Sequence, residues 1–157
     1  MQLTIHIKDF DNNNIYFCNK TENTVISGGS FYRLMYCTKD FSMLGIHVLF
    51  DTEVSLGTTT YQYTFKEIIS KISEKVLSVI LMITAQIHNK WLLDIDSKNS
   101  KPLNPITVYN IEQSVSKAVD TYKNQLKKGV KIPFILKCSG IYETEFETGI
   151  SFRLNYK

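Results

Sequence analysis

Near residue 65, the spacing of apolar residues changes from two to between three and four. In the first residues, Leu3, Ile5 and Ile7 alternate with polar residues, which is the period of a strand with one buried face. Farther on, the apolar positions are Phe65, Ile69, Ile72, Val76, Ile80, Ile83 and Ile87. This period predicts an amphipathic helix over about 66–88 with a broad, mostly buried apolar face. The β-branched middle of the segment leaves open a kink or a switch to strand near Ser78.

The rest of the chain predicts more strands and one more helix. The expected strands cover residues 2–8, 15–18, 31–37, 43–50, 61–65, 91–95, 130–138 and 141–155. Ser139-Gly140 is expected to join the last two strands. Asn104 as N-cap and Pro105 at the first helical position predict the start of the second helix, and Gly129 predicts its end. Regular βαβ alternation is missing, so we expect an α+β fold with a largely antiparallel sheet, either open or partly closed as an OB-like barrel.

Composition sets the class of protein. The chain has 157 residues, of which 43% are hydrophobic, enough for a single domain over 1–157 with one core. The three cysteines are far apart and show no CxxC spacing, which is typical of reduced thiols in an intracellular protein, cytoplasmic or nuclear. The N-terminal residues lack the pattern of a secretion signal, and the apolar run at 76–83 is too short to cross a membrane.

Catalytic chemistry has no supporting pattern in this sequence. The three histidines, His6, His47 and His88, each stand apart from any nucleophile motif. Gly28-Gly29 leads into an expected strand, whereas a phosphate-binding glycine loop leads into a helix. We therefore expect a protein that is not an enzyme, with no catalytic residue and no cofactor.

Two acidic stretches are candidates for metal sites. Residues 94–99 supply only two oxygen ligands in the order that a calcium loop requires, and Lys98 stands at the third position. Glu143, Glu145 and Glu147 are expected on one face of a strand, where three carboxylates form a solvated surface more often than a magnesium site. We expect no metal.

What remains is a pattern of aromatic and basic residues interleaved on expected strands. Unstacked bases pack on aromatic rings and phosphates pair with Lys or Arg, so this mixture on an open sheet is typical of single-stranded nucleic-acid binding. Aromatic residues on strands more often belong to the core, and that reading is the alternative for each ring. The candidates for stacking are Tyr32, Arg33, Tyr36, Trp91 and Phe152. The candidates for phosphate contacts are Lys39, Lys90, Lys128, Lys131, Lys137 and Arg153.

The C-terminal segment resembles a known class of protein. Residues 137–145 (KCSGIYETE) and 149–154 (GISFRL) are similar to the closing hairpin of small single-stranded-DNA-binding proteins of DNA viruses and virus-like linear plasmids. The resemblance is confined to this hairpin. It implies an OB-like fold, a role in DNA replication and a viral origin.

Together these observations predict a binding protein. The leading hypothesis is sequence-tolerant binding of single-stranded nucleic acid, DNA in particular, with no membrane partner. A net charge of +3 permits an anionic partner without requiring one. The alternative is a viral structural or assembly protein that forms homo-oligomers through the edges of its sheet.

Overall fold

The computed structural model describes residues 3–22, 28–53, 65–95, 102–104, 108–122 and 131–157. It confirms the α+β class, with two α-helices and an eight-stranded, mostly antiparallel sheet. The strands are β1 Ile5–His6, β2 Ile15–Phe17, β3 Thr21–Glu22, β4 Ser30–Cys37, β5 Ser42–Leu44, β6 Ile46–Glu53, β7 Lys131–Glu143 and β8 Thr148–Tyr156. The helices are α1 Phe65–Asp94 and α2 Val108–Tyr122, and two short 3-10 helices cover Ile7–Asp9 and Asn12–Asn14.

The sheet is not closed into a barrel, so the expected OB-like closure is wrong. Its main strand order is β1-β6-β7-β4-β2, and the two end strands do not pair with each other in the described chain. β1 pairs with β6 in parallel, and the other named strands pair antiparallel. β2 pairs with β4 and not with β1, which precedes it in the chain.

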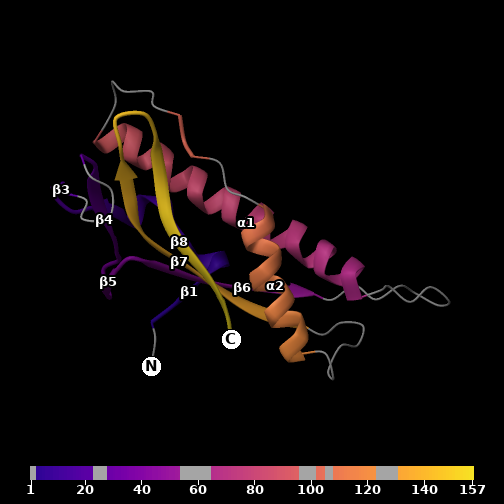
Figure 1. The fold of residues 1–157 in the computed structure, drawn as a ribbon. Coiled ribbons are helices and arrows are strands. Elements are labelled where there is room, and N and C mark those ends of the chain that lie inside the picture. The colour runs from indigo at the N-terminus through magenta and orange to yellow at the C-terminus, as the bar shows by residue number, and fades with distance from the viewer. Residues whose placement is uncertain (1–2, 23–27, 54–64, 96–101, 105–107, 123–130) are drawn as a thin grey trace.

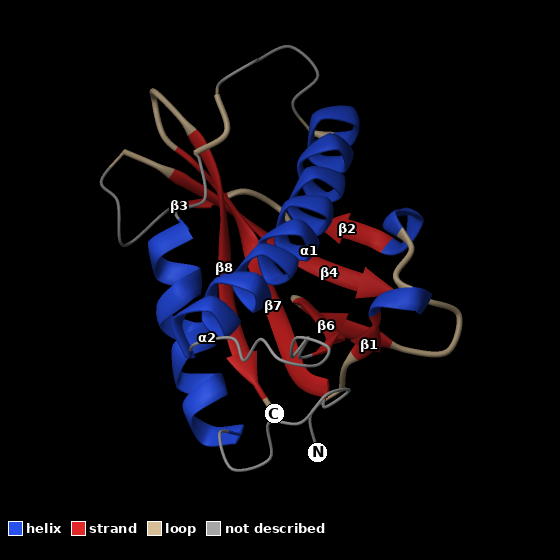
Figure 2. Ribbon diagram, turned by 90° about the vertical axis from the view of Figure 1, so that its right-hand side faces the viewer, coloured by secondary structure: helices blue, strands red, loops and turns tan. Residues whose placement is uncertain are grey.

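Both helices lie on the same face of the sheet (Figure 1, Figure 2). The predicted helix is confirmed, and it is longer than expected. Trp91 follows Ile87 at the helical spacing of four and is 1% exposed, so the segment predicted as a strand at 91–95 continues α1 as far as Asp94. The apolar stripe of α1 packs on inward-facing strand residues such as Leu34, Val48 and Leu136 to form the core.

β7 organises the sheet because it pairs along both of its edges. One edge pairs with β8, and the other pairs first with β6 and then with β4. The register shifts between Cys138 and Gly140, which marks Ser139 as a β-bulge. Ser139-Gly140 therefore lies within one continuous strand and is not the predicted turn. The hairpin turn lies at Thr144–Glu147, where the Thr144 N–H donates to the Glu147 carbonyl at 2.8 Å.

This turn also corrects the predicted glutamate face. Glu143 ends β7, whereas Glu145 and Glu147 belong to the turn, so the three carboxylates do not share one strand. No group of three His, Cys, Asp or Glu side chains that can hold a metal occurs among the described residues.

Several predictions concern residues outside the described part of the chain. These are the strand at 61–65 up to residue 64, Pro105 at the start of the second helix, Gly129 at its end, and Lys128. Neither of the described helices combines the length and the apolar character needed to cross a bilayer.

Candidate nucleic-acid interface

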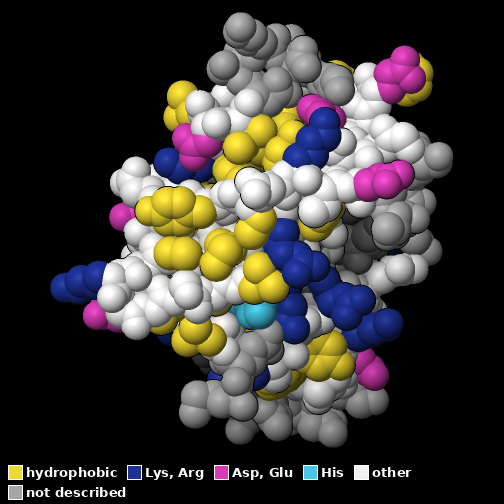
Figure 3. Space-filling view, turned by 90° about the vertical axis from the view of Figure 1, so that its left-hand side faces the viewer, with side chains coloured by type: hydrophobic (Ala, Val, Ile, Leu, Met, Phe, Trp, Pro, Cys, Tyr) yellow, Lys and Arg dark blue, Asp and Glu magenta, His cyan; other side chains and the backbone are white. Residues whose placement is uncertain are grey.

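The two faces of the sheet differ in what covers them. One face packs against α1 and α2, and we call the opposite one the open face. Alternation along β6 and β7 sends Ile46, Val48 and Phe134 toward the helices. Figure 3 views the open face and shows Lys and Arg side chains in a run across it, next to a His side chain and an apolar area. An anionic ligand can reach this face directly.

Three side chains form a row across the open face. His47 on β6 lies directly opposite Lys137 on β7, and Lys137 lies directly opposite Arg153 on β8. We call these residues the basic row. Arg33 on β4 is a fourth basic residue on this face. It lies opposite Gly140 on β7, and Gly140 lies opposite Ser151 on β8. Ser151 precedes Arg153 by two residues, so both lie on the same face of β8.

The electrostatics of the row are unfavourable for the protein alone. Like charges directly opposite each other on neighbouring strands destabilise a sheet. In the described chain, no carboxylate forms an ion pair with Arg33, Lys137 or Arg153. Partial burial, followed by the charge of Lys137, lowers the pKa of His47, while a hydrogen bond with the Leu3 backbone opposes that shift. An anion bound at this row would relieve the repulsion.

Exposed apolar and aromatic side chains lie beside these cations. Tyr16, Met35 and Leu44 are cross-strand partners on β2, β4 and β5, and Tyr16 and Leu44 are each 53% exposed. We call them the apolar row. Met35 follows Arg33 by two residues, so the apolar row adjoins a basic residue on the same face.

Two further rings lie across the open face over glycines. A Cβ atom on Gly149 would meet the Tyr142 ring at 2.0 Å, and one on Gly140 would meet the Phe31 ring at 2.5 Å. The Tyr142 hydroxyl also accepts a hydrogen bond from the Asn104 side chain at 2.8 Å. Half-buried rings held in this way offer flat surfaces for stacking at a small cost in conformational entropy.

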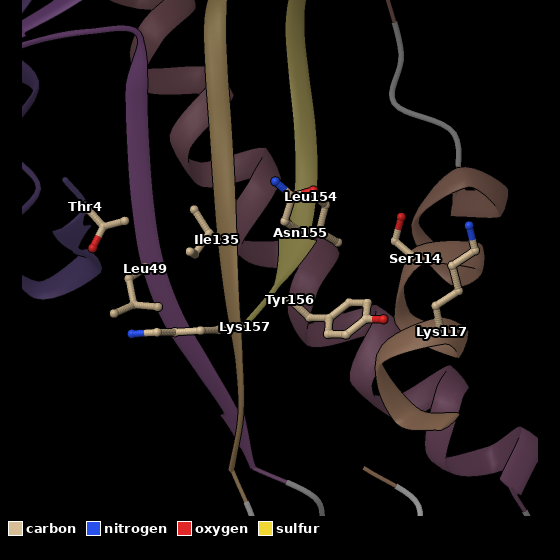
Figure 4. A pocket seen from close by; sticks show the side chains of 9 residues that line it. All are labelled: Thr4, Leu49, Ser114, Lys117, Ile135, Leu154, Asn155, Tyr156 and Lys157. Atoms are coloured by element: carbon tan, nitrogen blue, oxygen red, sulfur yellow. The ribbon is translucent and has the colours of Figure 1, made fainter. Parts of the chain in front are cut away.

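A cavity of about 760 Å³ borders the basic row (Figure 4). Leu49, Ile135 and Asn155 are cross-strand partners one row further along β6, β7 and β8, and all three line the cavity. Its remaining lining residues are Thr4, Ser114, Lys117, Leu154, Tyr156 and Lys157.

Four of the predicted site residues share the open face. Arg33, Lys137 and Arg153 come together as described above. Lys131 also lies on this face, near the start of β7, where it faces Glu53 on β6. Lys39 is exposed in the turn between β4 and β5 and is not part of the row.

The predicted stacking role does not hold for Tyr36 and Trp91, because each is only 1% exposed. The Tyr36 ring stacks with Phe10 and Phe41, and its hydroxyl accepts a hydrogen bond from the Asp11 N–H at 2.9 Å. It therefore anchors the N-terminal turns. Trp91 packs edge-on against Tyr32, with ring centroids 6.0 Å apart.

The remaining predicted contacts also lie on the helix side. Tyr32 faces α1 through its contact with Trp91, and Phe152 packs against the core opposite Cys138. Lys90 lies on α1 and forms an ion pair with Asp94 at 3.4 Å, so it does not join the basic row.

Tyr16, Phe31 and Tyr142 were missed as candidates from the sequence. Alternation shows that each ring and the residue next to it lie on different faces of the strand. It does not show which of the two faces the helices cover. A usable signal was present at Tyr16, since Ile15 and Phe17 on either side supply the buried positions of β2.

No protein-family model, curated protein or solved structure matches this chain.

Proposed function

We propose that the open face binds single-stranded nucleic acid without strong sequence preference and without catalysis. Arg33, Lys137 and Arg153 hold phosphates, and Tyr16, Phe31 and Tyr142 offer rings to the bases. DNA during replication is the case implied by the resemblance of the C-terminal hairpin.

The observation that carries this proposal is the placement of Lys137 opposite Arg153, with Arg33 nearby, on the face opposite α1 and α2. β4 and the β7–β8 hairpin, which are far apart in sequence, bring these cations together at an electrostatic cost. Phosphates on a flexible strand offset that cost and release their counterions on binding. Rings on an open sheet are worth roughly 1–3 kcal/mol for each stacked base and tolerate any sequence.

A salt titration with a matched pair of variants tests the proposal. Fluorescence anisotropy with a labelled single-stranded oligonucleotide is measured for the native chain, Arg153→Ala and Lys90→Ala. Binding should weaken linearly with the logarithm of salt, and Arg153→Ala should reduce the slope by about 0.7, the value of one phosphate contact on a single strand. Lys90→Ala removes the same charge from the helix side and should leave the slope unchanged.

Two outcomes would count against the proposal. If the oligonucleotide does not bind at low salt, the proposed function is wrong. An equal effect of both variants would show that net charge, and not the open face, attracts the strand.

One observation favours the alternative, an assembly protein. Among the described strands, β8 pairs only with β7, apart from an isolated bridge between Leu103 and Thr148, so most of its outer edge remains available for another strand. We propose self-association through this edge as the second candidate. Size-exclusion chromatography distinguishes the two, because assembly predicts salt-insensitive oligomers without oligonucleotide and strand binding predicts a shift only with it.

A further inference from the structure

The cavity at the end of β8 is lined by residues from both sides of the sheet. Thr4, Leu49, Ile135, Asn155 and Lys157 line the part on the open face, and the other residues belong to β8 and α2. In Figure 4, the Lys157 side chain points to the side of β8 on which Thr4 and Leu49 lie, while the Tyr156 ring points toward α2. The Tyr156 hydroxyl accepts a hydrogen bond from Thr121 on α2 at 3.2 Å, which ties the end of β8 to α2.

The open-face part lies immediately beside the basic row. Leu49 and Asn155 follow a residue of that row by two positions, and Ile135 precedes Lys137 by two positions on the antiparallel strand β7. Two residues of a strand span about 6.6 Å, so the cavity floor and the cations are separated by roughly that distance. In a polynucleotide, one sugar separates a phosphate from its base, which is a span of the same order.

The lining also suits a nucleobase in chemical terms. Leu49 and Ile135 give an apolar floor, in which Leu49 is half-buried and Ile135 is 9% exposed. The Asn155 amide carries both donors and acceptors for the edge of a heterocycle. The Lys157 side chain adds a positive charge for an adjacent phosphate. Apolar walls with a few polar groups are the usual composition of a small-molecule pocket.

We propose that this part of the cavity receives one nucleobase of the bound strand, while the basic row holds the adjoining phosphate. The inference rests on the proposed function and adds a single anchored base to a surface that otherwise binds by stacking. It also predicts that the strand crosses β8 at the row of Arg153.

The test compares two oligonucleotides of equal length and charge, one natural and one in which every nucleotide is abasic. The probes are titrated by fluorescence anisotropy with the native chain, Leu49→Ser and Leu81→Ser. Leu81 is 50% exposed on α1 and serves as the matched control. We expect the native chain and Leu81→Ser to prefer the natural strand strongly, and Leu49→Ser to lose about tenfold of that preference while binding the abasic strand as before. If Leu49→Ser does not fold, Asn155→Ala on the same cavity gives the equivalent comparison.

Three outcomes would overturn the inference. If Leu49→Ser and Asn155→Ala keep the full preference for the natural strand over the abasic one, the cavity does not recognise a base, and the proposed function is unaffected. Deoxyadenosine monophosphate that occupies the cavity as tightly as the oligonucleotide identifies a free nucleotide as the ligand. Binding of neither oligonucleotide removes the proposed function and this inference together.

Discussion

Single side chains show how burial sets chemistry in this protein. Burial raises the pKa of the Cys138 thiol to about 12, so this cysteine remains protonated and unreactive in the folded chain. His88 stacks on Trp91, with ring centroids 6.1 Å apart, and burial lowers its pKa below the ordinary 6.5. The pKa of His47 is lowered as well, by partial burial and by Lys137.

These two histidines predict a loss of stability in acid. Below pH 6.5 the unfolded chain binds protons that the folded chain resists, so the free energy of unfolding falls as the pH drops through the lowered pKa values. Urea denaturation at pH 7 and pH 5 measures this loss, which should be smaller in the double variant His47→Gln, His88→Gln. An equal loss in both proteins would contradict the prediction.

Among the elements, β7 depends most on glycine residues, because neighbouring backbones approach it closely. It changes partner from β6 to β4 at the bulge, and the chain between β5 and β6 bends at Gly45, which has a φ of 77° that favours glycine. The Gly45 N–H donates to the Leu34 carbonyl at 2.7 Å. Three strands therefore meet at a junction where the backbones approach closely.

Gly140 is the position at which this junction is most sensitive. A Cβ atom there would lie 2.4 Å from the Tyr32 backbone oxygen, which cannot move without disturbing the β4–β7 pairing. Gly140→Ala should therefore cost about 1–3 kcal/mol in the free energy of unfolding, as overpacking generally does. Gly149→Ala should cost less, because the nearest atoms there belong to the end of the Tyr142 side chain and not to the backbone. Urea denaturation compares the two, and an equal cost would show that the backbone contact is not limiting.

Across the whole molecule, the helices bury one face of the sheet and leave charges on the other. Asp51 and Glu53, at the far end of β6, are exposed acidic residues on the open face. The cations near Arg153 lack such neighbours in their own row. If the proposed function is right, this repulsion lowers stability in the absence of an anion.

Two lysines of the same strand and face test this directly. Lys137→Thr should weaken oligonucleotide binding, and the relief of repulsion should raise stability by about 0.2–1 kcal/mol. Lys131→Thr removes an equal charge from opposite Glu53, so binding should change little and stability should not rise. Anisotropy and urea denaturation are measured on both variants. If the two behave alike, the position of the charge in the sheet has no role.

Local periodicity was sufficient to predict the α+β class, the strands around β4 and β6, and the first helix. Periodicity is a property of neighbouring residues. A strand alternates and a helix repeats every 3.6 residues, whatever the rest of the chain does. Trp91 was misassigned since its place in the stripe of α1 depends on a helix that continues past the predicted end. Lys137 and Arg153 were predicted as phosphate contacts, but the local sequence pattern does not show that they lie opposite each other.

The side of each strand that became core was settled by packing over long distances in the chain. Phe31 and Tyr32 are neighbours with similar chemistry, but Tyr32 contacts Trp91 on α1, on the same side of β4 as the buried Leu34, and Phe31 therefore lies on the open face. The bulge at Ser139 likewise reverses the alternation of β7, so that Tyr142 shares a face with Arg33 and Arg153. Alternation specifies that two faces exist, whereas burial of apolar surface against the helices selects which one meets the solvent.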